Sequence, residues 1–587
     1  MVKIFKYMKP FEWLLIFTSL LFIVAQVWLD LKLPDYMSEI TGYVQTKGSS
    51  MSQIWESGAF MLLCALGSLA ASIVVGFFAA RIAASFTARL RSMLFNKVES
   101  FSMKEINKFS TASLITRSTN DITQIQMIVT IGLQVLIKAP ILAVWAIVKI
   151  SGKSWQWTAT TAGAVGLLLL FILIVGLLAL PKFRVIQSLT DNLNRVSREN
   201  LTGLRVVRAY NAEDYQKAKF EEANDNLTKT YLFTTRVMAS MMPFMMLIMS
   251  GLSLAVYWIG AYLIDQANMM DRIGLFSDMV VFSSYAMQIV MAFLMMTAVF
   301  IMMPRAAVAA NRINEVLDTE LSITDGCSQD EATKETGTVE FRNVSFKYPD
   351  SSEYVLQNIS FKASQGETVA FIGATGSGKT TLINLIPRFY DATEGEVLVD
   401  GINVKQYAQK NLHNKLGYVP QRNVLFSGSI KSNVAYGSSK TGQNDSAAVE
   451  KAVAIAQGSE FVRKMDGEYE AHVAQGGSNF SGGQKQRLSI ARAIYRKPEI
   501  YLFDDSFSAL DYKTDRVLRA ALKKETSTAT NLIVAQRIGT IMDADKIIVL
   551  DEGKIAGCGT HEELLKTCQV YQEIAYSQLS KEELKNA

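Results

Sequence analysis

The stretch VAFIGATGSGKTTLINLI, from Val369 to Ile386, decides how the second half of the chain folds. An apolar run leads into the spacing Gly373-x-x-x-x-Gly378-Lys379-Thr380, and a second apolar run follows. A strand, a glycine-rich loop and a helix N-terminus in this order form a P-loop, whose backbone N–H groups surround phosphate oxygens. In such a loop the lysine reaches the β- and γ-phosphates, and the threonine hydroxyl can ligate Mg²⁺. The sequence therefore predicts a nucleotide site in an α/β domain.

A second apolar run, IYLFDDSFSALD from Ile500 to Asp511, contains two adjacent carboxylates. The run before them has the length of a buried strand, which would deliver both acidic groups to a site at its tip. Asp504 is placed to hold a metal ion, and Asp505 is placed to activate a water molecule. However, an aspartate is one methylene shorter than a glutamate, and a displacement of about 1 Å can reduce a catalysed rate on the order of 100-fold.

Apolar residues are concentrated in the first half of the chain, in long runs that end near Arg305. The chain has 587 residues, of which 49% are hydrophobic, and its mean hydropathy is +0.17. A net charge of +5 is modest and gives no sign of nucleic-acid binding. The cysteines are far apart and lack metal-ligand spacing, which indicates reduced thiols at Cys64, Cys327, Cys558 and Cys568.

A bilayer core is crossed by about 20 apolar helical residues. Six stretches of the chain meet that length, near residues 11–33, 58–80, 129–150, 157–180, 238–262 and 275–303. The connections 81–128 and 181–237 are long and polar, which predicts helices that continue beyond the membrane. We therefore expect an α-helical six-span transmembrane domain over 1–318 with long cytoplasmic helical extensions. A short polar linker at 319–336 then leads to an α/β P-loop nucleotide-binding domain at 337–587.

Lysine and arginine are concentrated in the two long connections and before the first span. The three short connections hold only Lys47, Lys153 and Arg272. Because positively charged loops stay on the cytoplasmic side, both termini and the nucleotide-binding domain are expected in the cytoplasm. Short outer loops and the lack of a transit-like presequence favour a multi-pass protein of the bacterial plasma membrane, with an organellar membrane as the alternative.

Four further stretches, placed in a fixed order around the P-loop, carry a family resemblance. They are the tyrosine of FKYPD (Tyr348), the glutamine of YVPQ (Gln421), NFSGGQKQR (Asn479 to Arg487) and SALD (Ser508 to Asp511). Together with the P-loop they resemble the motif set of ATP-binding cassette (ABC) ATPases. Six spans followed by one such cassette look like a half-transporter of the exporter type, and this likeness covers the whole chain. Ala112 to Asp121 and Glu199 to Asp214 resemble that family's loop segments, including its coupling helices, with ordinary amphipathic helix surface as the alternative.

The resemblance implies a dimer in which two cassettes close head-to-tail over two ATP molecules. It implies that Tyr348 stacks on adenine and that Gln421 senses the γ-phosphate. Binding of ATP with Mg²⁺ at this chain's own P-loop is implied for Gly373, Thr375, Gly376, Ser377, Gly378, Lys379, Thr380 and Thr381. The implied Mg²⁺ ligands are Thr380, Gln421 and Asp504. Contact with the ATP bound on the partner is implied for Ser481, Gly482, Gly483 and Gln484.

Two positions depart from the pattern of the family that the chain resembles. A glutamate usually follows the metal-binding aspartate as general base, and this chain has Asp505. A histidine usually precedes the arginine of IVAQRIGT, and this chain has Gln536. A glutamine can hydrogen-bond a γ-phosphate oxygen, but it cannot carry the charge or the proton of an imidazole. Gln475 likewise stands where many exporters have glutamate.

Both changes in one site with intact binding motifs predict a site that holds ATP and hydrolyses it poorly. Asp505 and Gln536 are then weak or inactive catalytic positions. We therefore expect the degenerate-site subunit of a heterodimeric multidrug-type exporter, whose partner half-transporter supplies the glutamate and the histidine. The intact signature motif of this chain would complete the partner's catalytic site. A homodimer with slow hydrolysis is the alternative.

Methionines cluster in the fifth and sixth span regions, at Met238, Met241, Met242, Met245, Met246, Met249, Met279, Met287, Met291, Met295, Met296, Met302 and Met303. Flexible, polarisable side chains suit a surface that accepts many apolar shapes, although methionine also serves in helix packing. Hydrophobic or cationic drug-like molecules are therefore the predicted substrates. A cation would favour a carboxylate in the cavity, and Asp30 lies near the outer end of its span while Lys138 is the deepest cation. A lipid or peptide exporter and a nucleotide-gated channel or sensor are the alternatives.

Overall fold

A computed structural model of the chain describes residues 2–46, 49–151, 154–268, 271–326, 335–436 and 445–579. The chain forms two compact units. The membrane unit holds Met1–Glu99 and Ala112–Thr319, and the cassette unit holds Ser100–Thr111 and Glu320–Ala587. The domain bounds expected from the sequence stay predictions. Residues 327–334 of the expected linker lie outside the described residues, as do Lys47 and Lys153.

The membrane unit is helical, and six of its described helical stretches are long and apolar enough to cross a bilayer. This confirms the predicted number of spans. Its elements, in chain order, are η1 (Val2–Tyr7), α1 (Pro10–Gln45), α2 (Met51–Glu99), α4 (Thr111–Thr116), η2 (Arg117–Asp121), α5 (Ile122–Ile131), η3 (Gly132–Leu136), α6 (Lys138–Ser151), α7 (Trp155–Thr202), α8 (Leu204–Ala209), α9 (Glu213–Ala239), α10 (Met241–Gln266) and α11 (Arg272–Leu317). The short segments η2 and η3 are π-helical and lie within the third helical stretch.

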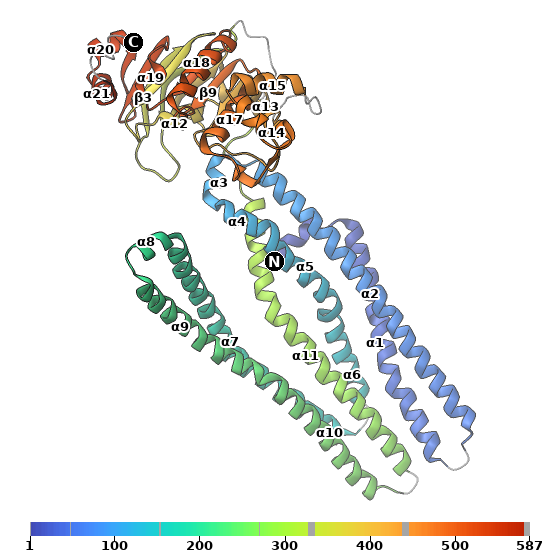
Figure 1. Cartoon of the computed structure of the whole chain (residues 1–587). Coiled ribbons are helices and arrows are strands. Elements are labelled where there is room, and N and C mark those ends of the chain that lie inside the picture. Colours follow the sequence, from blue (N-terminus) through green and yellow to red (C-terminus); the bar gives the residue numbers. More distant parts are fainter. Residues whose placement is uncertain are drawn as a thin grey trace. The chain divides into compact units, whose positions relative to one another are not determined.

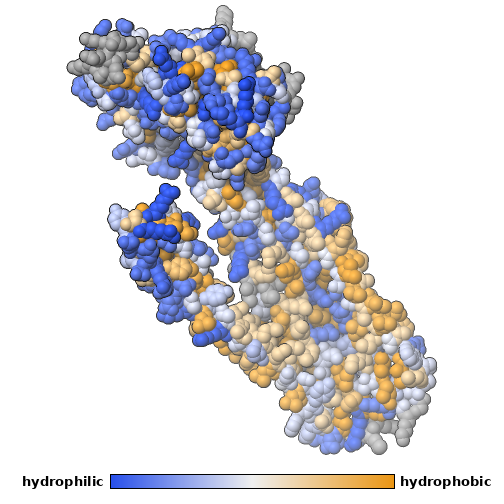
Figure 2. Space-filling view, viewed as in Figure 1, coloured by the Kyte–Doolittle hydropathy of each residue, from blue (hydrophilic) through white to orange (hydrophobic). Residues whose placement is uncertain are grey.

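Several helices extend well beyond an apolar core. α2 has 49 residues and α7 has 48, whereas about 20 residues cross a bilayer. In Figure 1, α7 and α9 run side by side and are joined at one end by α8. Figure 2 shows apolar side chains spread over the surface of the helices of the membrane unit. Leu63, Leu69 and Leu177 keep 61%, 57% and 66% of their surface exposed, which suits contact with lipid.

Two carboxylates of α1 are paired with lysines of α6. Asp30 binds Nζ of Lys138 at 3.1 Å and also accepts from the Ser68 hydroxyl. Asp35 binds Nζ of Lys149 at 2.7 Å. Removing one partner of such a pair leaves an uncompensated charge in a poorly hydrated setting, which is expensive. Asp30 and Lys138, both singled out in the sequence, therefore neutralise each other.

The cassette unit is built on a six-stranded and a four-stranded sheet. The larger sheet has the order β12-β11-β3-β10-β9-β6, in which β12 is antiparallel and the other neighbours are parallel. The smaller sheet, β2-β1-β4-β5, is antiparallel, and β7 pairs separately with β8. The mixed sheet with its covering helices confirms the predicted α/β class.

The strands of the cassette unit are β1 (Val339–Phe346), β2 (Leu356–Ala363), β3 (Thr368–Gly373), β4 (Glu394–Val399), β5 (Ile402–Asn403), β6 (Leu416–Val419), β7 (Gly428–Ser429), β8 (His472–Val473), β9 (Ile500–Asp504), β10 (Thr530–Val534), β11 (Lys546–Asp551) and β12 (Lys554–Gly559). Its helices are α3 (Met103–Phe109), α12 (Lys379–Leu385), η4 (Val404–Gln406), α13 (Gln409–Lys415), α14 (Ile430–Val434), α15 (Ser446–Ile455), α16 (Ser459–Arg463), η5 (Glu468–Glu470), η6 (Gln475–Gly477), α17 (Gly482–Arg496), α18 (Tyr512–Glu525), α19 (Ile538–Ile541), α20 (His561–Thr567) and α21 (Gln569–Gln578).

The strand β9 has an apolar sequence up to its last residue, Asp504. All five of its residues are buried, as expected for a parallel strand covered on both faces. Leu502 packs into one core cluster with β1 and β2, whereas Tyr501 and Phe503 pack into a second cluster with α17. The two clusters hold the strand from both sides, so the position of Asp504 at its end is firmly defined.

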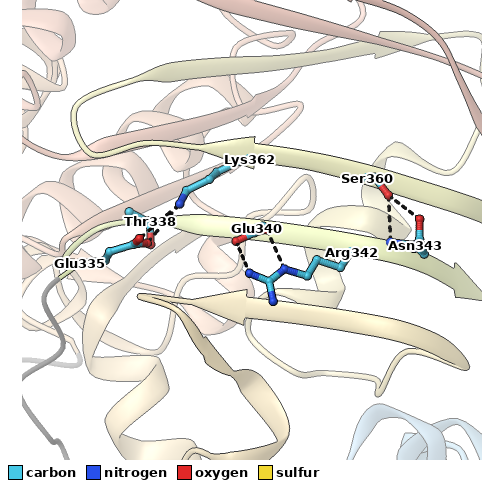
Figure 3. A network of polar contacts seen from close by, with 7 residues as sticks. All are labelled: Glu335, Thr338, Glu340, Arg342, Asn343, Ser360 and Lys362. Carbon is cyan, nitrogen blue, oxygen red and sulfur yellow. Dashed lines mark hydrogen bonds and ion pairs between the residues drawn. The ribbon is translucent and has the colours of Figure 1, made fainter.

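An exposed polar network lies on one face of β1 and β2 (Figure 3). Arg342 binds Glu340 of the same strand at 2.7 Å, and Lys362 of β2 binds Glu335 at 3.3 Å. Phe341 lies between the first two residues in sequence and is buried in the core, because successive side chains of a strand point to opposite faces. Exposed ion pairs of this kind contribute little to stability, because water screens their charges.

Candidate nucleotide site

The predicted site residues gather at one edge of the larger sheet. β3, β10, β9 and β6 are neighbours and parallel, so their carboxyl ends meet at that edge. At the ends of these strands come, in the same order, Lys379 of the P-loop, Gln536, Asp504 and Gln421. Parallel α/β sheets bind ligands in the crevice beyond the carboxyl ends of their strands. The topology thus brings together residues that are far apart in the sequence.

The P-loop backbone requires glycine at two of the predicted positions. Gly376 and Gly378 have φ angles of 88° and 96°, in the left-handed region that favours glycine. A Cβ on Gly378 would also lie 2.7 Å from Cδ2 of Leu356. Thr375 and Gly376 are exposed at the tip of the loop, whereas Ser377 is buried beneath it. The exposed backbone of the tip is therefore free to approach a ligand.

Lys379 folds back over its own loop. Its Nζ donates to the carbonyl oxygens of Gly373 and Ala374, both at 2.8 Å. Burial lowers the pKa of Lys379, because the charged ammonium group is partly removed from water. Carbonyl dipoles balance a buried positive charge only in part, so the loop fits an anionic ligand such as a nucleotide phosphate.

A hydroxyl group and a carboxylate meet beside the P-loop. Thr380 Oγ1 donates to Asp504 Oδ1 at 2.9 Å, and Asp504 is 1% exposed. Burial raises the pKa of Asp504. Hydroxyl and carboxylate oxygens are ligands that Mg²⁺ accepts, so these two residues fit the ion that accompanies a nucleotide. Gln421, the third predicted Mg²⁺ ligand, hydrogen-bonds Asp505 instead.

Asp505 is the meeting point of two amide side chains. Gln536 Nε2 donates to Asp505 Oδ2 at 2.8 Å, and Gln421 Nε2 donates to the same oxygen at 3.3 Å. Burial raises the pKa of the Asp505 carboxyl. Its backbone has a φ angle of 47°, a left-handed value that aspartate tolerates better than most residues. The two positions that depart from the family pattern are thus in direct contact.

The predicted signature residues form the start of α17. The Ser481 hydroxyl accepts from the Gln484 N–H at 3.3 Å, and Gln484 Oε1 accepts from the Ser481 N–H at 2.9 Å, which is a capping box. Gly482 and Gly483 make the first turn of the helix. Among the described residues, no hydrogen bond joins these four to the P-loop. The signature and the P-loop of this chain are therefore separate features.

Tyr348 lies next to the helix that follows the P-loop. Its hydroxyl group and the Thr381 hydroxyl are 2.9 Å apart, and its ring meets the ring of Tyr390 edge-on at 5.3 Å. Thr381 is buried. Both residues, predicted from the sequence to bind nucleotide, are thus tied to each other at the side of the P-loop.

The structure adds a residue that sequence reasoning missed. The side chain of Gln578, at the end of α21, binds the backbone on both sides of Arg537. A glutamine at a helix end carries no local signal, so only the fold reveals this contact. Two of the three histidines have side-chain partners away from Asp505: His413 binds the Pro387 carbonyl oxygen and His561 binds the Tyr571 hydroxyl.

α3, a short helix of the cassette unit, lies just before Ala112 to Asp121, which resembles one of the family's loop segments. α3 belongs to the cassette unit, and Asn107 Nδ2 donates to the Tyr390 hydroxyl at 3.1 Å. Ala112 to Asp121 belongs to the membrane unit and forms α4 and η2, and its role as a loop segment of the family stays a prediction. α3 is a separate short helix that starts at a capping box on Ser102.

Comparison with known proteins identifies the family. Residues 356–508 match the family model described as ABC transporter, and residues 16–293 match the ABC transporter transmembrane region. An uncharacterized ABC transporter ATP-binding protein of Mycobacterium tuberculosis (strain CDC 1551 / Oshkosh) is 40% identical, over 98% of this chain and 97% of its own length. The chain belongs to the ABC transporters. With six candidate spans and one cassette, it is a half-transporter of exporter architecture with an ATPase domain.

Two further relatives and one solved structure extend the comparison. The uncharacterized ABC transporter ATP-binding protein YfiB of Bacillus subtilis (strain 168) is 35% identical over 99% of both chains. An ATP-dependent lipid A-core flippase of Pseudomonas fluorescens (strain Pf0-1) is 30% identical, over 84% of this chain and 80% of the flippase. A bacterial Atm1-family ABC exporter with ATP bound has a TM-score of 0.77 at 23% identity, covering 96% of this chain and 98% of its own, which establishes the shared fold. This ABC transporter is therefore a multi-pass membrane protein whose cassette binds ATP to drive export.

Proposed function

We propose that this chain is the degenerate-site half of a heterodimeric exporter, which binds ATP in its own P-loop site and hydrolyses it poorly. The observation that carries the proposal is the hydrogen bond of 2.8 Å from Gln536 Nε2 to Asp505 Oδ2, which joins the two positions that depart from the family pattern. A general base must present an oxygen to the attacking water. The Gln536 amide occupies one Asp505 oxygen. The other oxygen extends less far than a glutamate oxygen would, because the aspartate side chain is one methylene shorter.

The binding residues of the site are proposed to be intact. Tyr348 flanks the adenine, and the residues from Gly373 to Thr381 surround the phosphates. Thr380, Asp504 and Gln421 hold Mg²⁺, for which Gln421 must exchange its hydrogen bond to Asp505. Bound MgATP supplies the phosphate charge that draws the two cassettes together. Within the chain, Lys379 neutralises that charge, and Asp504 orients Thr380 through their 2.9 Å hydrogen bond.

The signature motif is proposed to serve the partner subunit. Its residues Ser481, Gly482, Gly483 and Gln484 start a helix, and a helix N-terminus with its N–H groups attracts phosphate. They make no hydrogen bond to this chain's own P-loop among the described residues. A second half-transporter that carries glutamate and histidine would then complete the catalytic site and perform most of the hydrolysis.

The proposed substrates are hydrophobic or amphipathic small molecules of the multidrug type. Met242 and Met246 are 62% and 66% exposed and lie one turn apart on α10, as an adaptable apolar surface requires. Asp30 is neutralised by Lys138, so it does not offer a free carboxylate to a cationic substrate. These contacts favour uncharged apolar substrates over cationic ones.

A lipid is the second candidate substrate. Its support is the 30% identity to proteins named as ATP-dependent lipid A-core flippases over 84% of this chain. A lipid exporter would use the same nucleotide site, so uptake of fluorescent dye and of fluorescent lipid into inside-out vesicles distinguishes the two.

The Lys and Arg distribution supports a bacterial plasma membrane location with both termini and the cassette in the cytoplasm.

Steady-state ATPase activity of the chain purified alone in lipid tests the degenerate site. The proposal predicts nucleotide binding with little turnover, and Lys379→Ala should abolish the binding. Robust hydrolysis that the Lys379→Ala variant loses would instead make Asp505 a working base in a homodimer. Mixing with a second half-transporter from the same cell should then leave the rate unchanged, whereas the proposal predicts a large increase.

A further inference from the structure

The last described helix of the cassette contacts the nucleotide site through one side chain. α21 packs beside α19, the short helix that follows the 536–538 segment (Figure 1). Gln578 Oε1 accepts from the Ile538 N–H at 2.8 Å, and Gln578 Nε2 donates to the Gln536 carbonyl oxygen at 2.7 Å. A single amide group thus satisfies one donor and one acceptor of the same backbone segment, which fixes the segment at two points.

These bonds continue to the carboxylate at the centre of the site. The Gln536 backbone is held by Gln578, and the Gln536 side chain donates to Asp505 at 2.8 Å. On the other side of the segment, Arg537 donates to the Ser508 carbonyl oxygen at 3.1 Å. The 536–538 segment is therefore held on one side by α21 and on the other by the loop after Asp505.

We propose that Gln578 is a positioning residue, which holds the backbone of the 536–538 segment so that the Gln536 side chain reaches Asp505 and the γ-phosphate. The inference rests on the proposed nucleotide site and extends it to the end of α21. Gln578 touches neither nucleotide nor metal in this role. It acts only through Gln536, so its effect depends on the presence of the Gln536 side chain.

The packing of α21 does not depend on the Gln578 amide. Tyr571 and Ala575 of this helix are both 0% exposed and belong to a core cluster with β3 and β11. The Tyr571 hydroxyl lies 2.6 Å from Nδ1 of His561. Gln578 itself is exposed at the helix end, so its truncation leaves these core contacts in place. The variant Gln578→Ala should therefore fold.

The test uses the full chain in lipid nanodiscs and two measurements. The first is hydrogen exchange of the 536–541 segment without nucleotide, which reports the hold on the Ile538 N–H directly. The second is the dissociation rate of radiolabelled ATP with Mg²⁺. Both are measured for the wild type, Gln578→Ala, Gln536→Ala and the double variant. Gln569→Ala is the matched control, because the Gln569 side chain is exposed on the same helix and donates to Glu573 at 3.0 Å.

The proposal predicts about threefold or faster exchange of the 536–541 segment in Gln578→Ala, the effect of losing one hydrogen bond. For the ATP dissociation rate, it predicts a faster rate in Gln578→Ala and a double variant that matches Gln536→Ala. Unchanged exchange in Gln578→Ala would overturn it. So would effects of Gln578→Ala and Gln536→Ala on the ATP dissociation rate that multiply in the double variant. Rapid hydrolysis by the wild type would refute the degenerate site alone, because exchange and the double variant still decide the role of Gln578.

Discussion

The two halves of the nucleotide site differ in how closely their residues follow the pattern of the ABC family. In the half around Lys379 and Thr380, the glycines, the buried ammonium group and the hydroxyl–carboxylate pair with Asp504 have the arrangement that phosphate and Mg²⁺ binding need. In the half around Asp505, the carboxylate is short and two glutamine amides occupy one of its oxygens. Both halves lie at the carboxyl ends of the parallel strands of one sheet, so the difference is chemical and not topological. The proposal therefore predicts that substitutions in the two halves affect binding and hydrolysis separately.

The largest expected effect comes from the binding half. Lys379→Ala removes the buried positive charge that faces the phosphates and should weaken ATP binding by at least about 100-fold. Equilibrium binding of ATP to the chain in nanodiscs measures this. Lys464→Ala, which removes an exposed partner of Glu460, is the control and should leave binding unchanged. Binding within twofold of the wild type would show that the P-loop does not hold the phosphates.

The next largest effect should come from rebuilding the hydrolytic half. Asp505→Glu combined with Gln536→His restores a longer base and an imidazole, and should raise the ATPase rate by about 100-fold. Each single change should give much less, because the two side chains contact each other at 2.8 Å. The measurement is phosphate release by the four proteins of this cycle. Equal rates for the double variant and the wild type would mean that another feature of the site limits hydrolysis.

A moderate effect is expected at the boundary between the halves. Asp504→Asn removes the carboxylate that accepts from Thr380. It should weaken the apparent affinity of the ATP-bound chain for Mg²⁺ by about tenfold. Titration of Mg²⁺ at constant ATP gives the apparent affinity of the ion. Asn531→Ala, at a buried position near the amino end of the neighbouring strand β10, controls for loss of a buried polar group elsewhere in the same sheet. An unchanged Mg²⁺ titration in Asp504→Asn would place the ion elsewhere.

The smallest effect should come from the exposed network on β1 and β2. Arg342→Ala removes the pair with Glu340, in which water screens the exposed guanidinium group. ATP affinity and ATPase rate should match the wild type, and thermal unfolding should shift little. A large change in ATP affinity would mean that substitutions far from the site disturb it through general destabilisation, and the other variants would need the same correction.

The features that the sequence predicts are those that depend on residues close together in the chain. Apolar runs of sufficient length give the six spans, and the spacing around Lys379 gives the P-loop on its strand and helix. The contact of Gln536 with Asp505 was not predictable, because it depends on the order of β9 and β10 in the sheet. The pairing of Asp30 with Lys138 depends on which helices pack together.

Gln578 and α3 show a second reason for incomplete prediction. Gln578 acts through a backbone segment about forty positions away, and the glutamine type alone indicates no such role. α3 begins at a capping serine, Ser102, directly before a motif that drew attention to the following residues. Gln578 thus carries no short-range signal, and the short-range signal at Ser102 was overlooked beside the longer motif that follows it.

The fate of bound nucleotide tests the central claim most directly. The full chain in lipid nanodiscs would be incubated with ATP and Mg²⁺, washed free of unbound nucleotide, and analysed for retained ATP and ADP, with Lys379→Ala as the control. A site that binds and does not hydrolyse retains ATP, and the control retains neither nucleotide. Retained ADP in the wild type, together with released phosphate, would show that Asp505 and Gln536 catalyse hydrolysis and would contradict the account.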